Sequence, residues 1–173
     1  MHGAVLEDIR SGAADLGATY VDDLPDFVEA KRVSREVFDV ILPRSHPLAR
    51  TAKRSSITLS ELADFPLVSL PYESRTRRII DGAAAAAGHT LHHVATVTQF
   101  ATMMSFVRAG IGIAIVPAGA IVGFLGKDLA VLTLAKPRLS RNVGLIWLRE
   151  RELSPAARGF ATIFEGVWRS VIN

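Results

Sequence analysis

The run from Val97 to Pro117 constrains the fold of this chain more than any other segment. Its first half repeats apolar residues at the i, i+3, i+4, i+7 spacing of one helix face: Phe100, Met103, Met104 and Val107. Gly110 follows where a helix often ends on a left-handed residue. The apolar run 112–116 then stops at Pro117, which is typical of a short strand buried on both faces. The segment predicts a helix followed by a buried strand, the unit of helix-covered sheets.

Length and composition narrow the class of protein further. A chain of 173 residues, 49% of them hydrophobic, can fill one ordinary domain or two small lobes. A net charge of +3 does not argue for nucleic-acid binding by this segment. The absence of cysteine excludes disulfides, thiolate catalysis and cysteine metal sites. No apolar run reaches membrane-spanning length, and the first residues lack a signal-peptide pattern, so we expect a cytoplasmic protein with no membrane partner.

Elsewhere, predicted strands alternate with predicted helices. Short apolar runs predict strands at 15–18, 33–42, 67–70, 92–97, 129–134 and 143–148. Helical spacing and capping residues predict helices at 5–9, 58–61, 74–87 and 155–171. The acidic segment 21–32 is expected to be a loop, and the basic segment 49–57 to be exposed. This alternation predicts an α/β fold with a largely parallel sheet.

The loop Pro71–Thr76, between a strand and a helix, is the best local candidate for a ligand site. Ser74 and Thr76 offer hydroxyl groups beside the N–H groups of a helix start, and Arg75 can pair with a carboxylate. The alternative is an ordinary helix cap at Ser74, followed by solvated arginines up to Arg78. The chain pattern alone favours that alternative.

A second candidate lies at the next helix start, where Thr98 and Gln99 follow a predicted strand. Thr98 can cap the helix and Phe100 can belong to the core while Thr98 and Gln99 still face a ligand. Met103 and Met104 are interpreted as packing residues. Thr19, after the first predicted strand, is a third candidate.

No pattern predicts a metal, a cofactor or a catalytic centre. His89, His92 and His93 have ligand spacing only in a helix, and Gly88 argues against one there, so we expect surface histidines. No nucleophile elbow, phosphate loop or zinc-protease motif is present, and no acid/base pair can be assigned. We therefore expect no cofactor, no metal and no enzymatic activity.

Four segments together resemble the effector-binding domain of LysR-type transcriptional regulators. In order along the chain, they are the motif GAADLG at 12–17, the strand ending in HPLA at 37–49, the helix-GIG-strand-Pro run already described, and VGLIW at 143–147 before an aromatic amphipathic helix. No single motif is decisive, but their order and spacing cover essentially the whole chain.

The resemblance implies a type II periplasmic-binding-protein-like fold, with two α/β lobes joined by two crossing hinge strands at 33–42 and 143–148. The first lobe would comprise residues 1–34 and 143–173 and would be incomplete, because the family's first strand, helix and second strand do not precede Met1 in this sequence. Residues 35–142 would form the second lobe.

The resemblance also implies function: sensing a small-molecule effector, an organic anion, and assembling into a homo-oligomer, a dimer or tetramer. DNA would be bound only through a winged helix-turn-helix absent from this chain. The effector contacts implied are Tyr72, Ser74, Arg75, Thr76, Thr98, Gln99, Phe100 and Thr19, whereas Arg77 and Arg78 would not contribute. Two alternatives stay open, a solute-binding protein of the same fold and an enzyme on that scaffold.

Overall fold

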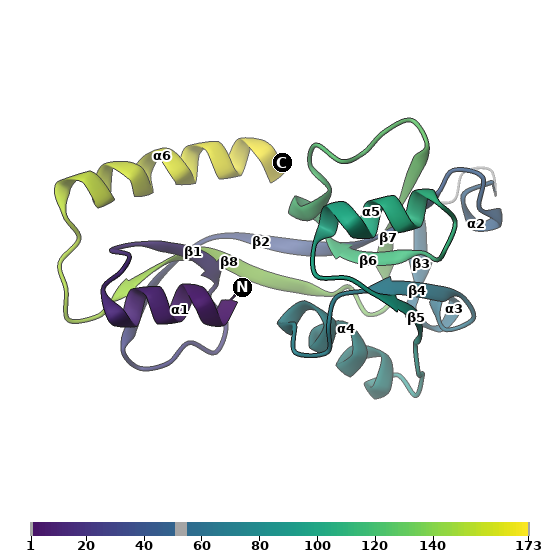
Figure 1. Cartoon of the computed structure of the whole chain (residues 1–173), viewed down its shortest axis with the longest axis horizontal. Helices are drawn as coiled ribbons and strands as arrows, with labels where there is room; N and C mark the ends of the chain where they lie inside the picture. Colours follow the sequence, from purple (N-terminus) through teal and green to yellow (C-terminus); the bar gives the residue numbers. More distant parts are fainter. Residues whose placement is uncertain (1, 51–54, 173) are drawn as a thin grey trace. The chain divides into compact units, whose positions relative to one another are not determined.

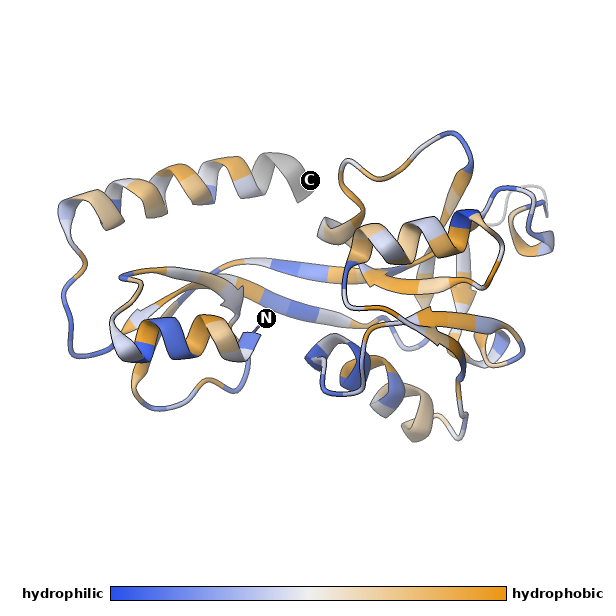
Figure 2. Ribbon diagram, in the orientation of Figure 1, coloured by the Kyte–Doolittle hydropathy of each residue, from blue (hydrophilic) through white to orange (hydrophobic). Residues whose placement is uncertain are grey.

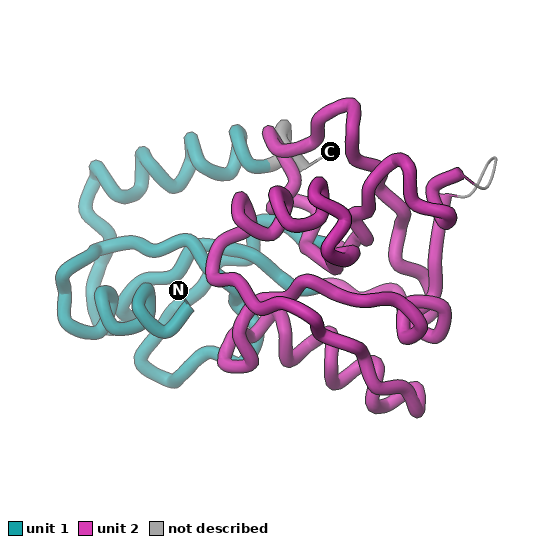
Figure 3. Tube along the Cα trace, turned by 45° about the vertical axis from the view of Figure 1, so that its right-hand side comes forward, with its two compact units in different colours: residues 1–36, 141–173 teal, residues 37–140 magenta. Residues whose placement is uncertain are grey.

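The computed structural model describes residues 2–50 and 55–172, with side chains described up to residue 168. Its chain forms two compact units, shown in different colours in Figure 3. Unit 1 comprises residues 1–36 and 141–173, and unit 2 comprises residues 37–140. Two strands, β2 (Val28–Pro43) and β8 (Ser140–Leu148), contribute residues to both units.

Unit 1 holds the two ends of the chain. Besides its parts of β2 and β8, it contains α1 (His2–Ser11), β1 (Gly17–Tyr20) and α6 (Pro155–Ile172) (Figure 1). β1 pairs with β8 in antiparallel fashion, with Ala18 opposite Leu145. Ile9 and Val28 are buried against Ile146 in a small core of this unit.

Unit 2 holds the remaining elements. In chain order they are α2 (Pro47–Arg50), β3 (Ser56–Thr58), α3 (Leu59–Leu62), β4 (Pro66–Ser69), α4 (Arg75–Ala86), β5 (His92–Thr96), α5 (Phe100–Arg108), β6 (Ala114–Pro117), the 3-10 helix η1 (Ala118–Ile121) and β7 (Leu129–Ala135). The second part of β2 pairs antiparallel with both β6 and β7, and β3 adds parallel to β7. β4 and β5 form a parallel pair, which a parallel bridge between Leu67 and Ile113 links to the start of β6.

The strands of unit 2 bury side chains on both faces, and this explains their apolar runs. On β6, Ile115 belongs to the core that includes Ile80 and Ala84 of α4. Its neighbour Val116 belongs to the core that includes Met103 and Met104 of α5. Successive side chains point to opposite faces of a strand, so α4 covers one face and α5 the other. β6 accordingly has hydrophobic colouring in Figure 2.

Several predicted boundary residues behave as expected. Gly110 ends α5 with φ +74°, and Gly88 follows α4 with φ +77°. Thr58 and Glu61 form a capping box at the start of α3. At α6, the Ala157 N–H donates to Ser154 Oγ at 3.2 Å. The helix over Phe100–Arg108 is confirmed, with Met103 and Met104 fully buried as packing residues.

The α/β class is confirmed, but the prediction of a largely parallel sheet is wrong. β2 is flanked by antiparallel partners on both sides, because one long strand, rather than a series of strand–helix–strand crossovers, forms the middle of unit 2's sheet. An alternating order of strands and helices does not determine which strands become neighbours.

Two segments, one expected to be a loop and one expected to be exposed, contain parts of strands. β2 starts at Val28, inside the predicted loop 21–32. The prediction missed this start because the exposed positions there carry charged residues, so the sequence shows no strand pattern. β3 overlaps the end of the basic segment 49–57, and its residue Ile57 is not exposed but buried in the core that includes Leu132 and Leu134 of β7. Residues 51–54 lie outside the described part of the chain. Minor shifts also occur, since β1 begins at Gly17 rather than residue 15.

The predicted amphipathic helix at the end of the chain is present as α6. Trp168 Nε1 donates to Ser34 Oγ at 2.8 Å, and Lys31 pairs with Glu165 at 2.6 Å. Three apolar side chains of α6 are nevertheless more than half exposed, namely Phe160, Ile163 and Val167.

Candidate functional site

The carboxyl ends of β4 and β5 bring two helix starts to one edge of unit 2's parallel pair. The Val97 N–H donates to the Ser69 carbonyl at 2.9 Å, which ties the end of one strand to the end of the other. α4 begins shortly after β4, at Arg75, and α5 begins shortly after β5, at Phe100. Ligands of open α/β sheets bind at such edges, where free helix N–H groups favour anions.

In the loop between β4 and α4, called the first loop below, the predicted contact residues differ in burial. Thr76 is 2% exposed and lines a cavity, whereas Tyr72 is 68% exposed. Arg75 and Ser74 are half-buried at the start of α4. Ser74 occupies the N-cap position, as predicted, but its side chain makes no capping hydrogen bond. The prediction that its hydroxyl caps the helix is therefore wrong.

In the second loop, Thr98 and Gln99 are exposed and Phe100 packs partly into the α5 core. The N-cap position belongs to Gln99, again without a side-chain capping bond. The expectation that Thr98 caps this helix is therefore wrong. The exposure of Thr98 and Gln99 leaves the expectation of ligand contact compatible with the structure.

Thr19 belongs to unit 1, at the end of β1. Its Oγ1 lies 2.8 Å from His2 Nδ1, and it is buried. Next to it, the Tyr20 ring stacks with the His2 ring and lies 4.1 Å from the Arg141 guanidinium carbon. Arg141 Nε in turn donates to the buried Glu36 carboxylate. This second polar cluster was only partly predicted, since the sequence pointed to Thr19 and not to Glu36 or Arg141.

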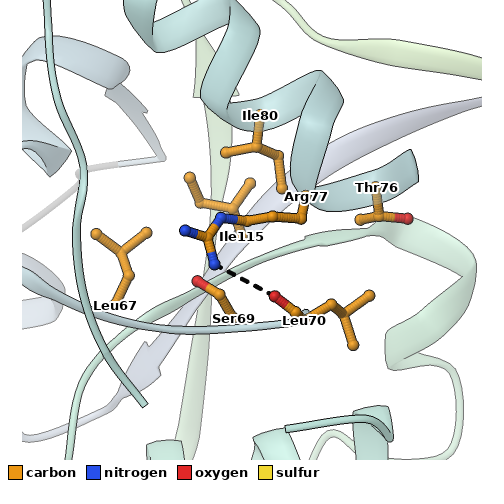
Figure 4. A pocket seen from close by; sticks show the side chains of 7 residues that line it. All are labelled: Leu67, Ser69, Leu70, Thr76, Arg77, Ile80 and Ile115. Atoms are coloured by element: carbon orange, nitrogen blue, oxygen red, sulfur yellow. Dashed lines mark hydrogen bonds between the residues drawn. The ribbon is translucent and has the colours of Figure 1, made fainter. Parts of the chain in front are cut away.

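A small cavity opens at the first loop, beneath the start of α4. Its walls come from β4, α4 and β6, and its lining residues are Leu67, Ser69, Leu70, Thr76, Arg77, Ile80 and Ile115 (Figure 4). Its volume is about 10 Å³, roughly the room for one water-sized group. Figure 4 shows the Ser69 hydroxyl and the Arg77 guanidinium directed into the same space.

Arg77 is not the solvated arginine that the sequence led us to expect. Its side chain is 13% exposed, its Nε donates to Asp81 Oδ2, and its NH1 donates to the Leu70 carbonyl at 3.3 Å. Arg78, in contrast, is exposed as expected. Arg77 therefore ties α4 to the end of β4.

His93 also departs from expectation, since it is not a surface histidine. Its side chain is 15% exposed, its Nδ1 hydrogen-bonds with Ser69 Oγ, and its Nε2 lies 3.0 Å from Asp81 Oδ1. Burial lowers the pKa of His93 below 6.5, and the nearby Arg77 guanidinium adds to this effect, while Asp81 opposes it. His93 is therefore neutral at neutral pH.

Ser69, His93 and Asp81 have the composition of a hydrolytic triad without its arrangement. The histidine faces the serine through Nδ1 and the aspartate through Nε2, the reverse of serine proteases. The aspartate is also paired with Arg77, and the serine faces a cavity with room for one water. Among the described residues, no group of three or more His, Cys, Asp or Glu side chains could hold a metal ion.

Comparisons with known proteins agree with this architecture. The sequence model of the LysR substrate binding domain matches residues 1–169. The uncharacterized HTH-type transcriptional regulator YybE of Bacillus subtilis is 28% identical over 156 residues, covering 90% of this chain and 52% of that protein. This chain spans about half the length of the curated relatives that it matches, 52% and 50% for two of them.

Two solved structures have the same fold. The effector binding domain of QuiR in complex with shikimate superposes with a TM-score of 0.77 at 25% identity, covering 95% of this chain and 76% of that one. The CcmR regulatory domain of Synechocystis PCC6803 in complex with 2-PG gives a TM-score of 0.82 at 18% identity, covering 96% and 79%.

The chain belongs to the LysR substrate-binding domain family, which is a family of effector-binding domains of transcriptional regulators and not of enzymes. No helix in the described part of the chain is long and apolar enough to cross a membrane.

Proposed function

We propose that this chain senses a small organic anion on behalf of a LysR-type transcriptional regulator working in the cytoplasm. The observation that carries the proposal is the family match over residues 1–169. A second support for the proposal is that two domains of the same fold were solved in complex with small molecules, shikimate and 2-PG. DNA recognition would reside in a helix-turn-helix outside these 173 residues, as the names of the relatives suggest.

The fold proposed is the type II periplasmic-binding-protein-like one. Units 1 and 2 would be its two lobes, and β2 and β8, which contribute to both units, would be the two hinge strands. An effector that binds one arrangement of such lobes better than another shifts the population toward it and thereby changes the attached regulator.

The proposed effector contacts are the two helix starts of unit 2. Arg75 lies in the first turn of α4, where its charge adds to the helix dipole, and Thr98 and Gln99 expose polar groups at the start of α5. Tyr72, Ser74, Thr76 and Phe100 border these groups, and Thr19 is the proposed contact on unit 1. Arg77 has a structural role instead, since its guanidinium already binds Asp81 and the Leu70 carbonyl.

Homo-oligomerisation is proposed through α4 and β5. Residues 85–87 expose small alanines, and β5 ends its sheet within the described residues while exposing Val94. Small side chains and an edge strand allow close approach of a second copy.

A screen of organic acids that includes shikimate and 2-PG tests the proposed function. A true effector at a hundredfold excess over its dissociation constant stabilises the folded chain by about 2.7 kcal/mol, which a thermal melt detects. Calorimetry on variants then tests the site. Arg75→Ala and Thr98→Ala should each weaken the effector about tenfold, while Arg78→Ala, an exposed arginine on the same helix, should not. Equal losses from Arg78→Ala and Arg75→Ala would refute the assignment.

A further inference from the structure

Four polar side chains between α4 and the β4–β5 pair form one continuous hydrogen-bonded network. Arg77 donates to Asp81, Asp81 contacts His93, and His93 contacts Ser69. Arg77 also donates to the carbonyl of Leu70, the residue after Ser69, so the network also contacts the backbone at the end of β4. Each side chain is one-quarter exposed or less. The network is therefore shielded from solvent.

With His93 neutral, the chemistry of the partners fixes the direction of every hydrogen bond in this network. The Asp81 carboxylate, paired with Arg77, can only accept, so His93 Nε2 must carry a hydrogen and donate. In a neutral imidazole the other nitrogen is then an acceptor. The Ser69 hydroxyl must therefore donate to His93 Nδ1, which turns its hydrogen away from the cavity.

We propose that His93 is a positioning residue that makes Ser69 an acceptor toward the cavity, so that this subsite selects an effector hydroxyl group over a carboxylate oxygen. A hydroxyl can donate to the lone pairs of Ser69, whereas a carboxylate oxygen, itself only an acceptor, is repelled by them. The proposal rests on the proposed function and narrows the effector from an organic anion to a hydroxy acid.

The size of the cavity agrees with a single hydroxyl group. A volume of about 10 Å³ accommodates one oxygen atom of an effector and not its carbon skeleton. Thr76 and the Arg77 guanidinium share the lining with Ser69. The effector's carboxylate would lie outside this cavity, at the helix starts that carry Arg75 and Thr98.

Protonation of His93 would reverse the preference. A cationic imidazole donates through both nitrogens, so Ser69 would accept from Nδ1–H and turn its own hydrogen toward the cavity. The charged or titratable groups acting on His93 are Arg77 and Asp81 from α4 and His92 from its own strand. Because burial and Arg77 lower the pKa of His93, the acceptor state of Ser69 is the one present at neutral pH.

The test compares two acids that differ by one hydroxyl group, lactate and propionate, on the whole 173-residue chain at pH 7.5. Long-range nitrogen–proton NMR should show His93 in its Nε2–H form. Lactate should bind about three- to tenfold more tightly than propionate. The pKa of His93 should be lower in lactate than in propionate, because the extra hydrogen bond favours the neutral imidazole while both acids carry the same charge.

Variants separate positioning from structure. Ser69→Ala removes the acceptor and should bring the lactate-to-propionate ratio to about one, and His93→Phe should do the same because it frees the Ser69 hydroxyl to rotate. His92→Phe is the matched control on the exposed face of the same strand and should keep the preference. If His93→Phe does not fold, Ser69→Ala alone decides.

Three results would overturn the proposal: an Nδ1–H form of His93, equal binding of the two acids, or a preference that survives Ser69→Ala. Equal binding that still depends on Arg75 would leave the proposed function standing. Failure of both acids to bind would overturn the hydroxyl selectivity, and the separate effector screen would then decide the proposed function.

Discussion

Gly112, between α5 and β6, is a position where a single methyl group should destabilise unit 2. A Cβ there would lie 2.6 Å from the Pro66 carbonyl oxygen and 3.1 Å from its carbon. Those atoms belong to backbone, which cannot rotate away as a side chain can. The same carbonyl accepts from the Ile113 N–H at 2.9 Å, and the Val68 N–H donates to the Ile113 carbonyl at 2.8 Å. Relief of the clash must therefore strain the link between β4 and β6.

Gly82, in the middle of α4, is the matched control. A Cβ there has nothing within 4 Å, and the position is exposed. Gly82→Ala should stabilise by about 0.5–1 kcal/mol, because alanine loses less backbone entropy in a helix. Gly112→Ala should destabilise by about 1–3 kcal/mol, the usual cost of overpacking. The two variants should thus differ by about 1.5–4 kcal/mol with opposite signs relative to the parent.

Urea unfolding followed by far-UV circular dichroism measures both free energies. Thermal melts should separate the variants by about 3–16 °C, at about 2–4 °C per kcal/mol for a chain of this size. A Gly112→Ala variant as stable as the parent would refute the claim that a Cβ at residue 112 clashes with the Pro66 carbonyl. A destabilised Gly82→Ala variant would show that a Cβ at residue 82 does not point into open space.

Three further outcomes are expected. Burial raises the pKa of Asp39 above 3.8, against the opposing Arg138 charge, so its ionised form costs stability. Asp39→Asn should therefore raise the free energy of unfolding at pH 7. The gain should shrink as the pH falls below the folded pKa and vanish below the ordinary value of 3.8, where the carboxyl is protonated in both states. Light scattering should show a dimer or larger assembly, which Val94→Asp on the β5 edge weakens and the exposed Val122→Asp does not; a clean monomer at high concentration would contradict this. Anisotropy titrations at physiological salt should show no sequence-specific DNA binding, because a net charge of +3 spread along the chain releases few counterions.

Elements with strong local signals could be predicted from the sequence. α5 was predictable because four apolar residues mark one face and Gly110 supplies the left-handed end. The α3 capping box was predictable because Thr58 and Glu61 satisfy each other within one turn. In both cases the structural cause lies within a few residues along the chain.

Strand direction and strand beginnings were less accessible. β2 is a neighbour of the distant strand β8 in the sheet, and the exposed residues near its start, Glu29, Lys31 and Arg32, give no apolar alternation. Whether β6 and β7 run antiparallel to β2 depends on which segments meet in space. Such long-range pairing leaves almost no local trace.

The candidate site shows the same division. Thr76, Thr98 and Gln99 could be proposed as ligand contacts because a polar residue between a strand and a helix is a local pattern. The hydrogen-bonded network that links Ser69, His93, Asp81 and Arg77 could not be predicted, because its members come from two strands and a helix. Only the i, i+4 spacing of Arg77 and Asp81 indicates a pair. His93 is a polar residue that becomes shielded only when α4 packs over its strand, and its hydrogen-bond direction follows from a carboxylate twelve residues earlier in the chain. The local pattern therefore predicts where the proposed site lies, whereas non-local contacts determine which side chains line its cavity and how they are hydrogen-bonded.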